Sequence, residues 1–331
     1  PYMPKITQSP DGHVFECDAG ETILRAALRA GIGMPYSCNT GSCGNCRFQL
    51  LDGTVTHLRE DAPAWSEREL KRGRWLGCQA VPDGACSVKF RSMDQYIPDI
   101  SPVSVTATLV EVKQITRDIS EFTFHADDLP AFHPGQYALL HVSGVTGGRA
   151  YSMSNLCDDG TWRFMIKQMP NGEATGALFA AEPGATITID GPYGTAFLRK
   201  DSPRDIVLLA GGSGLSPMVS IAKGAAAAGM LDTRTLHVFY GARETGDLCN
   251  AVVLGGQASE KARFIAALSD PDATWTGPKG FLHDVVAEHM AAQLKDCEIY
   301  FAGPAVMSAA VQEMAHEAGV PPDQLHFDEF Y

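Results

Sequence analysis

The pattern of hydrophobic and polar residues divides the 331-residue chain into regions of different character. In residues 1–92 a strand-and-turn stretch, VFECDAG, precedes an amphipathic helix, ETILRAALRAG, in which Ile23, Leu24, Ala27 and Leu28 share one face. Two pairs of short strand-like runs follow, RFQLLDGTVTHL and WLGCQAVPDGACSVKF, each broken by an Asp-Gly turn. This pattern predicts a small mixed α/β domain.

The rest of the chain shows two other patterns of hydrophobic and polar residues. From 105 to 202, short alternating strands separated by turn residues predict a compact antiparallel barrel. From 203 to 331, strands alternate with helical stretches, which predicts a parallel α/β sheet. Residues 93–104 are rich in proline and turn residues and show little periodicity, so we expect a linker that permits motion of the first domain. The fold class is therefore α/β multidomain.

Composition and charge exclude some classes of function. The N-terminal stretch PYMPKITQSP lacks the features of a signal peptide, and no apolar run approaches the roughly 20 residues of a membrane span. We therefore expect a cytoplasmic protein without membrane contact. The net charge of −13 argues against a nucleic-acid partner. One local exception is SERELKRGRW, residues 66–75, which fits either a solvated helix face or a docking patch for an acidic partner.

The cysteines carry the clearest chemical signal. Their odd number, nine, and their scatter over a long chain argue against a disulfide framework. Cys38, Cys43 and Cys46 follow the spacing C-x4-C-x2-C in a loop of small residues, and Cys78 follows farther along, which is the pattern of a plant-type [2Fe–2S] cluster. A structural zinc site is the alternative, but zinc usually takes paired C-x2-C knuckles. We predict that these four cysteines are cluster ligands.

Two further groups of motifs lie in the other regions. The run RAYSMSN, residues 149–155, is preceded by PGQY and followed by PNGEATGAL. The run LLAGGSGLSP, residues 208–217, follows a buried-looking strand and leads into a helix, a setting in which glycines bring backbone close to a dinucleotide. Its third glycine position is occupied by Pro217, which suits the first turn of a helix.

With these motifs the chain resembles, over essentially its whole length, the NADH-dependent reductase components of bacterial aromatic-ring oxygenases, such as those serving toluene, phenol, benzoate or carbazole oxygenation. The resemblance implies a β-grasp plant-type ferredoxin domain at 1–92, an antiparallel β-barrel flavin domain at 105–202, and a parallel α/β nucleotide-binding domain at 203–331, as in ferredoxin–NADP reductases. It also implies a [2Fe–2S] cluster, FAD and NADH as cofactors.

The same resemblance assigns roles in the flavin domain. Arg149 is expected to pair with the flavin pyrophosphate, Tyr151 to pack on the isoalloxazine ring, and Ser152 to reach toward flavin N5. The stretch from Gly172 to Thr175 resembles a loop that binds the pyrophosphate through N–H and hydroxyl donors. Together with Arg149, this loop favours FAD over FMN.

In the last domain the resemblance points to the dinucleotide site. Gly211, Gly212 and Gly214 belong to a G-G-x-G-x-x-P run that the family shares. Glu244 or Asp247, at the end of the next strand, is expected to accept a hydrogen bond from the ribose 2′-hydroxyl and to repel a 2′-phosphate, which favours NADH.

Two segments near the C-terminus complete the predicted site. Gly303 and Pro304 correspond to a C-G-P segment beside the nicotinamide, but the cysteine position holds Ala302, so no thiol is expected there. Reductases of this type often place a C-terminal aromatic residue over the flavin. Phe330 or Tyr331 is the candidate, and an apolar tail packed against the domain is the alternative.

Joined together, these sites imply an NADH-dependent electron-transfer reductase. NADH delivers a hydride to FAD, and single electrons pass through the cluster to a terminal oxygenase component or its Rieske ferredoxin. Ser152, Tyr151 and Phe330 act by positioning the reacting groups. The sequence has no His-x-His pair and no repeated Glu-x-x-His motif, so the oxygen-activating site is expected on another protein.

Two alternatives stay open. The same electron chain could feed a non-oxygenase partner, such as a deoxysugar dehydratase, or a soluble acceptor such as quinone. The chain could instead be an electron-carrier module without nicotinamide turnover, which the flavin and dinucleotide motifs disfavour. A monomer is expected.

Overall fold

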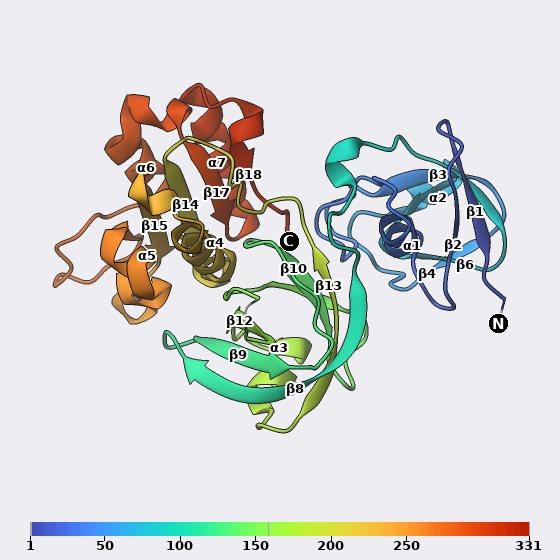
Figure 1. The fold of residues 1–331 in the computed structure, drawn as a ribbon, viewed down its shortest axis with the longest axis horizontal. Coiled ribbons are helices and arrows are strands. Elements are labelled where there is room, and N and C mark those ends of the chain that lie inside the picture. The colour runs from blue at the N-terminus through green and yellow to red at the C-terminus, as the bar shows by residue number, and fades with distance from the viewer. Residues whose placement is uncertain (1, 158, 331) are drawn as a thin grey trace.

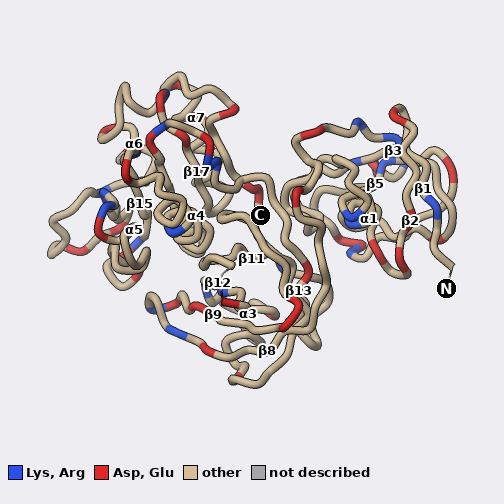
Figure 2. Tube along the Cα trace, viewed as in Figure 1, with Lys and Arg blue, Asp and Glu red and all other residues tan. Residues whose placement is uncertain are grey.

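The structure, a computed structural model, describes residues 2–157 and 159–330. The chain forms three lobes (Figure 1), and the segment that follows β18 lies near the centre, where the lobes meet. Lysine and arginine positions are interspersed with acidic positions in all three lobes (Figure 2). No helix in the described ranges is both long and apolar enough to cross a membrane.

The first lobe is a five-stranded sheet with one main helix. The sheet order is β2-β1-β7-β3-β5, with β1 antiparallel to β2 and parallel to β7, and β4 pairs with β6 in a separate ribbon. The elements are β1 (Lys5–Ser9), β2 (Val14–Glu16), α1 (Ile23–Arg29), β3 (Arg47–Asp52), β4 (Val55–His57), α2 (Glu67–Lys71), β5 (Arg74–Leu76), β6 (Ala80–Pro82) and β7 (Cys86–Lys89).

Helix α1 forms where the hydrophobic pattern predicts it. Thr22 caps its N-terminus by accepting a hydrogen bond from the Arg25 backbone N–H, and the predicted apolar face is buried. The strand-like runs around the Asp-Gly turns also form, but the strands on either side of each turn belong to different sheets. Short-range turn chemistry sets the strand ends, whereas pairing is decided by the lobe as a whole.

The second lobe is an antiparallel barrel. Its strand order is β11-β10-β13-β8-β9-β12, and a bridge between Met153 and Phe164 joins the two edge strands, which closes the sheet. The interior is filled by large aromatic side chains, including Phe122, Phe124 and Trp162. The elements are β8 (Val103–Gln114), β9 (Ile119–His125), β10 (Tyr137–His141), β11 (Arg149–Ser152), β12 (Thr161–Lys167), α3 (Glu173–Ala180) and β13 (Thr186–Tyr193).

The third lobe is a parallel sheet in the order β16-β15-β14-β17-β18, with helices packed against it. From β14 the chain adds β15 and then β16 on one side, and it then crosses back to add β17 on the other side of β14. The strand order therefore reverses between β14 and β17, and ligands commonly bind at the carboxyl ends of strands at such a switch point. The elements are β14 (Ile206–Gly211), α4 (Leu215–Ala227), β15 (Leu236–Ala242), α5 (Gly256–Lys261), β16 (Arg263–Leu268), α6 (Leu282–Met290), β17 (Glu298–Ala302), α7 (Ala305–Glu317) and β18 (Leu325–His326).

The segment that connects the first lobe to the barrel packs against the first lobe. At the start of the expected linker, the Met93 backbone N–H donates to the Gly33 carbonyl, 2.9 Å away, and a short helical turn, η1 (Asp94–Tyr96), places the Tyr96 ring 6.0 Å from that of Tyr36. The predicted end of the linker falls inside β8. The connection between the two lobes is therefore packed against the first lobe where it begins.

Candidate cluster, flavin and dinucleotide sites

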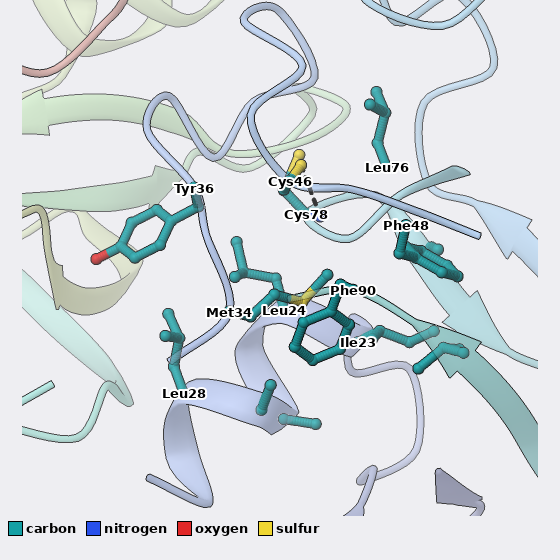
Figure 3. Packing of buried hydrophobic residues seen from close by; sticks show 14 of the residues in the cluster. Ile23, Leu24, Leu28, Met34, Tyr36, Cys46, Phe48, Leu76, Cys78 and Phe90 are labelled. Carbon is teal, nitrogen blue, oxygen red and sulfur yellow. Dashed lines mark hydrogen bonds between the residues drawn. The ribbon is translucent and has the colours of Figure 1, made fainter. Parts of the chain in front are cut away.

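The four predicted ligand cysteines form two pairs. The Cys43 backbone N–H lies 3.3 Å from Cys38 Sγ, and the Cys78 backbone N–H lies 3.4 Å from Cys46 Sγ. Cys46 and Cys78 lie side by side above the core that covers α1 (Figure 3). Two separate thiol pairs fit the two irons of a [2Fe–2S] cluster.

The loop around these thiols is built to hold negative charge. The backbone N–H groups of Thr40 and Ser42 each lie 3.4 Å from Cys38 Sγ, and that of Asn45 lies 3.4 Å from Cys43 Sγ. Hydrogen bonding from the Cys43 thiol and from backbone amides lowers the pKa of Cys38, and the same hydrogen bond raises the pKa of Cys43. Donors aimed at sulfur stabilise the thiolate form that metal binding requires. Cys43 is half-buried and the other three are buried.

Hydrogen bonds join the flavin motif to the third lobe. Ser152, at the end of β11, is buried and lies opposite Tyr137 of the neighbouring strand β10. The Ser216 hydroxyl in α4 donates to the Ser152 carbonyl at 2.7 Å and accepts from the Met165 backbone N–H at 3.0 Å. Ser216 lies in the predicted dinucleotide motif, but no local pattern predicts this role because its partners lie in another lobe.

A small cavity is lined by two of the three predicted catalytic residues, Ser152 and Phe330, and Tyr151 is not among its lining residues. Ser152, Phe330 and Ala302 line it together, so the structure brings the flavin motif, the C-terminal aromatic residue and the alanine of the Y-F-A-G-P segment to one place. The other candidate, Tyr331, lies outside the described residues. Asp328 also lines the cavity, and no motif in the sequence predicts this position. Burial raises its pKa to about 7, against the opposing effect of a backbone hydrogen bond and of nearby positive charge.

The predicted pyrophosphate-binding groups remain free for a ligand. Arg149 donates to the Thr146 carbonyl at 3.1 Å and has no acidic partner among the residues that the structure describes. Gly172 caps the N-terminus of α3, so residues 172–175 begin a helix, with Thr175 Oγ1 accepting from the Met169 backbone N–H at 3.3 Å. A guanidinium and an open helix N-terminus suit a pyrophosphate. Tyr151 is partly buried, which raises its pKa.

A larger cavity of about 240 Å³ lies between the barrel and the third lobe. Asp118 and Lys167 line it from the barrel. The predicted dinucleotide residues that line it are Gly211, Gly212, Asp247 and Pro304. Gly211 and Gly212, at the end of β14, therefore border this cavity at the switch point of the sheet, a position that fits a bound dinucleotide. Gly212 is the more exposed of the two, whereas a Cβ atom on Gly211 would stand 2.4 Å from Met307 Sδ.

Two predicted glycines lie beneath this cavity instead. A Cβ atom on Gly214 would stand 2.0 Å from the Ala302 carbonyl oxygen, and one on Gly303 would stand 2.5 Å from Met307 Sδ. These glycines let the turn after β14 pack directly on the turn after β17. Their observed contacts are structural, and a direct contact of either with the dinucleotide stays a prediction.

The two acids that are predicted to bind the ribose form ion pairs with an arginine of the barrel. Arg117, in the turn between β8 and β9, lies 2.7 Å from Asp247 Oδ1 and 3.2 Å from Glu244 Oε2. Glu244 is not among the residues that line the larger cavity. Arg117 was not predicted, because its partners lie far away in the sequence. The role of Glu244 in choosing the nicotinamide stays a prediction.

Comparisons with known proteins agree with this arrangement. Three family models match, described as a 2Fe-2S iron-sulfur cluster binding domain (residues 6–83), an oxidoreductase FAD-binding domain (106–197) and an oxidoreductase NAD-binding domain (208–313). The ferredoxin–NAD(P)(+) reductase CarAd of Metapseudomonas resinovorans is 37% identical over 100% of both chains. The ferredoxin–NAD(+) reductase component of an alkene monooxygenase system of Xanthobacter autotrophicus is 36% identical, over 97% of this chain and 98% of its own.

A solved structure titled as the ferredoxin reductase in carbazole 1,9a-dioxygenase has a TM-score of 0.92 and 35% identity, covering 100% of this chain and 99% of its own. The three domains and the paired thiols thus define an iron–sulfur flavoprotein oxidoreductase. More narrowly, the chain belongs to the ferredoxin–NAD(P)+ reductase components of multicomponent oxygenase systems. The predicted family, fold class and set of cofactors are confirmed.

Proposed function

We propose that this chain oxidises NADH and delivers electrons one at a time to the terminal oxygenase component of an aromatic-hydroxylating system, or to its Rieske ferredoxin. The observation that supports this most directly is the cavity shared by Ser152, Ala302 and Phe330, because it joins residues of the flavin and nucleotide lobes at one point. The domain boundaries that we propose are 1–92, 93–104, 105–202 and 203–331.

Bound FAD supplies the conversion of a two-electron hydride into single electrons. The chain's own residues hold and orient it. Arg149 and the N-terminus of α3 bind the pyrophosphate, Ser152 provides a buried hydroxyl beside the reacting ring, and Phe330 covers the ring from the C-terminal segment. The backbone at Gly211 and Gly212, which borders the larger cavity, admits the dinucleotide. These groups act through geometry, so no side chain is assigned as a general acid or base.

Delivery to the partner is assigned to the cluster loop. Cys43 is the least buried of the four ligands, so its side of the loop is the proposed exit for electrons. Helix α2 buries none of its residues, and Arg68, Lys71 and Arg72 make no ion pair within the described ranges. We propose that these three side chains assist docking of an acidic partner surface. Reversing Arg68 and Lys71 should slow reduction of the partner and leave ferricyanide reduction unchanged.

The relatives' titles include a carbazole dioxygenase system and an alkene monooxygenase system, so the family serves more than one kind of oxygenase. Our proposal of a cytoplasmic protein is supported by the five cysteines outside the proposed cluster, Cys17, Cys86, Cys157, Cys249 and Cys297, none of which forms a disulfide. Our proposal of a monomer is supported by the location of all three proposed sites within one chain.

An anaerobic titration with NADH, followed by visible absorption and EPR, tests the proposal. We expect loss of flavin absorbance together with a rhombic [2Fe–2S] signal, and we expect Cys46→Ser to abolish the signal while flavin reduction persists. Flavin reduction without the signal in the unmodified protein would restrict the function to that of a flavoprotein dehydrogenase. Oxygenation of an aromatic substrate by a partner only in the presence of this chain then tests the oxygenase assignment.

A further inference from the structure

Two segments at the flavin site converge on one residue of the cluster loop. The Tyr137 hydroxyl, on β10, donates to the Ser37 carbonyl oxygen at 2.5 Å. The Glu329 backbone N–H, in the C-terminal segment, donates to Ser37 Oγ at 2.8 Å. Ser37 directly precedes Cys38, a proposed cluster ligand. Both hydrogen bonds therefore end one residue away from the cluster.

The other ends of these contacts lie at the proposed flavin site. Tyr137 is fully buried and pairs with Ser152 across the barrel sheet. Its ring meets that of Phe330 edge-on, with the centroids 4.8 Å apart. Asp328 and Phe330, the neighbours of Glu329, both line the small cavity with Ser152. Tyr137 thus touches the wall of that cavity with its ring and the cluster loop with its hydroxyl.

Separate contacts hold the two lobes in this arrangement. The Gly194 backbone N–H donates to the Tyr36 hydroxyl at 2.7 Å, and Arg25 Nε lies 3.0 Å from Asp190 Oδ1. Tyr36 points away from the core around α1 toward the barrel (Figure 3). The Tyr137–Ser37 hydrogen bond therefore belongs to a buried and cross-linked interface. It does not depend on one exposed side chain.

We propose that the Tyr137–Ser37 hydrogen bond is the connection through which an electron passes from the flavin site to the cluster, which makes Tyr137 a positioning residue for intramolecular electron transfer. The proposal rests on the proposed function. Electrons tunnel more readily through covalent and hydrogen bonds than across gaps between unbonded atoms. One electron is lost at the flavin site and one is gained at the cluster, and Tyr137 keeps its proton and is not itself oxidised.

The test compares Tyr137→Phe with Tyr36→Phe in the full-length holoprotein. Each variant removes one phenolic hydroxyl from the same interface, but only the Tyr137 hydroxyl is hydrogen-bonded to Ser37, whereas the Tyr36 hydroxyl accepts from Gly194. Four quantities are measured: the rate of flavin reduction by NADH, the rate at which the cluster EPR signal appears after rapid freezing, the midpoint potentials of both centres, and hydrogen exchange in peptides at the lobe interface.

In Tyr137→Phe we expect the cluster signal to appear several-fold more slowly, with potentials, flavin reduction and interface exchange unchanged. In Tyr36→Phe the cluster signal should appear at the original rate. Ser37→Ala keeps the carbonyl acceptor, so it should also leave the rate unchanged. This variant is a second check if Tyr137→Phe lowers the flavin content.

Three results would overturn the proposal: an unchanged rate in Tyr137→Phe, equal slowing in Tyr36→Phe or Ser37→Ala, or slowing accompanied by a shifted potential or by faster interface exchange. The last result would mean that the slower transfer comes from a changed potential difference between flavin and cluster, or from separation of the two lobes. If NADH reduces no cluster in the unmodified protein, the proposed function itself fails. If it does, and Tyr137→Phe behaves identically, only the inference about Tyr137 fails.

Discussion

The ion pair between Arg25 and Asp190 is expected to hold the first lobe against the barrel. Arg25 lies on α1 and Asp190 on β13, with 3.0 Å between Nε and Oδ1 and with side chains that are 21% and 8% exposed. Tyr193 donates a second hydrogen bond to Asp190 at 2.5 Å. In Arg25→Gln, the Asp190 carboxylate would remain buried in the docked state with only the tyrosine as partner. In the undocked state, water would solvate it.

Removing one partner of a buried ion pair typically costs 3–5 kcal/mol, and the remaining tyrosine hydrogen bond and the partial exposure of Arg25 favour the lower end, about 3 kcal/mol. That cost corresponds to a roughly 150-fold larger equilibrium constant for undocking. The Gly194 backbone N–H, which donates to Tyr36 across the interface, reports on this opening. Hydrogen exchange of peptides containing Gly194 should therefore accelerate by about the same factor.

The matched control is Arg29→Gln. Arg29 lies on the same helix and binds the same carboxylate, Glu21, as Arg25 does, but it makes no contact with Asp190. Exchange at Gly194 should change little in this variant. Equal acceleration in both variants, or none in Arg25→Gln, would show that the cross-lobe ion pair does not hold the lobes together.

Three further predictions concern the remaining sites. Gly214→Ala places a Cβ 2.0 Å from the Ala302 carbonyl oxygen and should lower the free energy of unfolding by about 1–3 kcal/mol in denaturant titrations. Gly176→Ala, with no atom within 4 Å, should not lower it; equal losses would contradict the packing argument. Asp328 has a pKa raised by burial from 3.8 to about 7, so the stability that it contributes is complete below pH 4 and is lost as the pH rises through 7. Melting temperatures from pH 4 to 8 should fall less steeply in Asp328→Asn, and parallel curves would refute this. Glu244→Gln should lower the NADH/NADPH ratio of kcat/KM, and an unchanged ratio would remove its proposed role.

Several features of the fold could be predicted from the sequence because they depend on neighbours along the chain. The spacing of Cys38, Cys43 and Cys46 places three thiols in one loop whatever surrounds it, and the periodic apolar residues of α1 define the face that must be buried. The alternation of strands and helices after residue 203 restricts that lobe to a parallel sheet. Local chemistry was sufficient for each of these features.

The predicted nucleotide residues show where such reasoning stops. Gly214 belongs to a glycine-rich run, but whether a glycine faces a ligand or a neighbouring turn depends on the packing of β17, which no local pattern encodes. Glu244 and Asp247 look like free acids in the sequence. In the folded chain they share Arg117 from another lobe, since burial and charge pairing act between whichever surfaces meet.

The cofactor-binding modules thus follow from the sequence, because ligand spacing and hydrophobic period are properties of short segments. How these modules meet follows only from the folded chain. Tyr137 and Ser37 are separated by 100 positions and become hydrogen-bonded because the first lobe docks on the barrel beside the C-terminal segment. Contacts of this kind depend on the shape and burial of complete surfaces, which exist only once each lobe has folded.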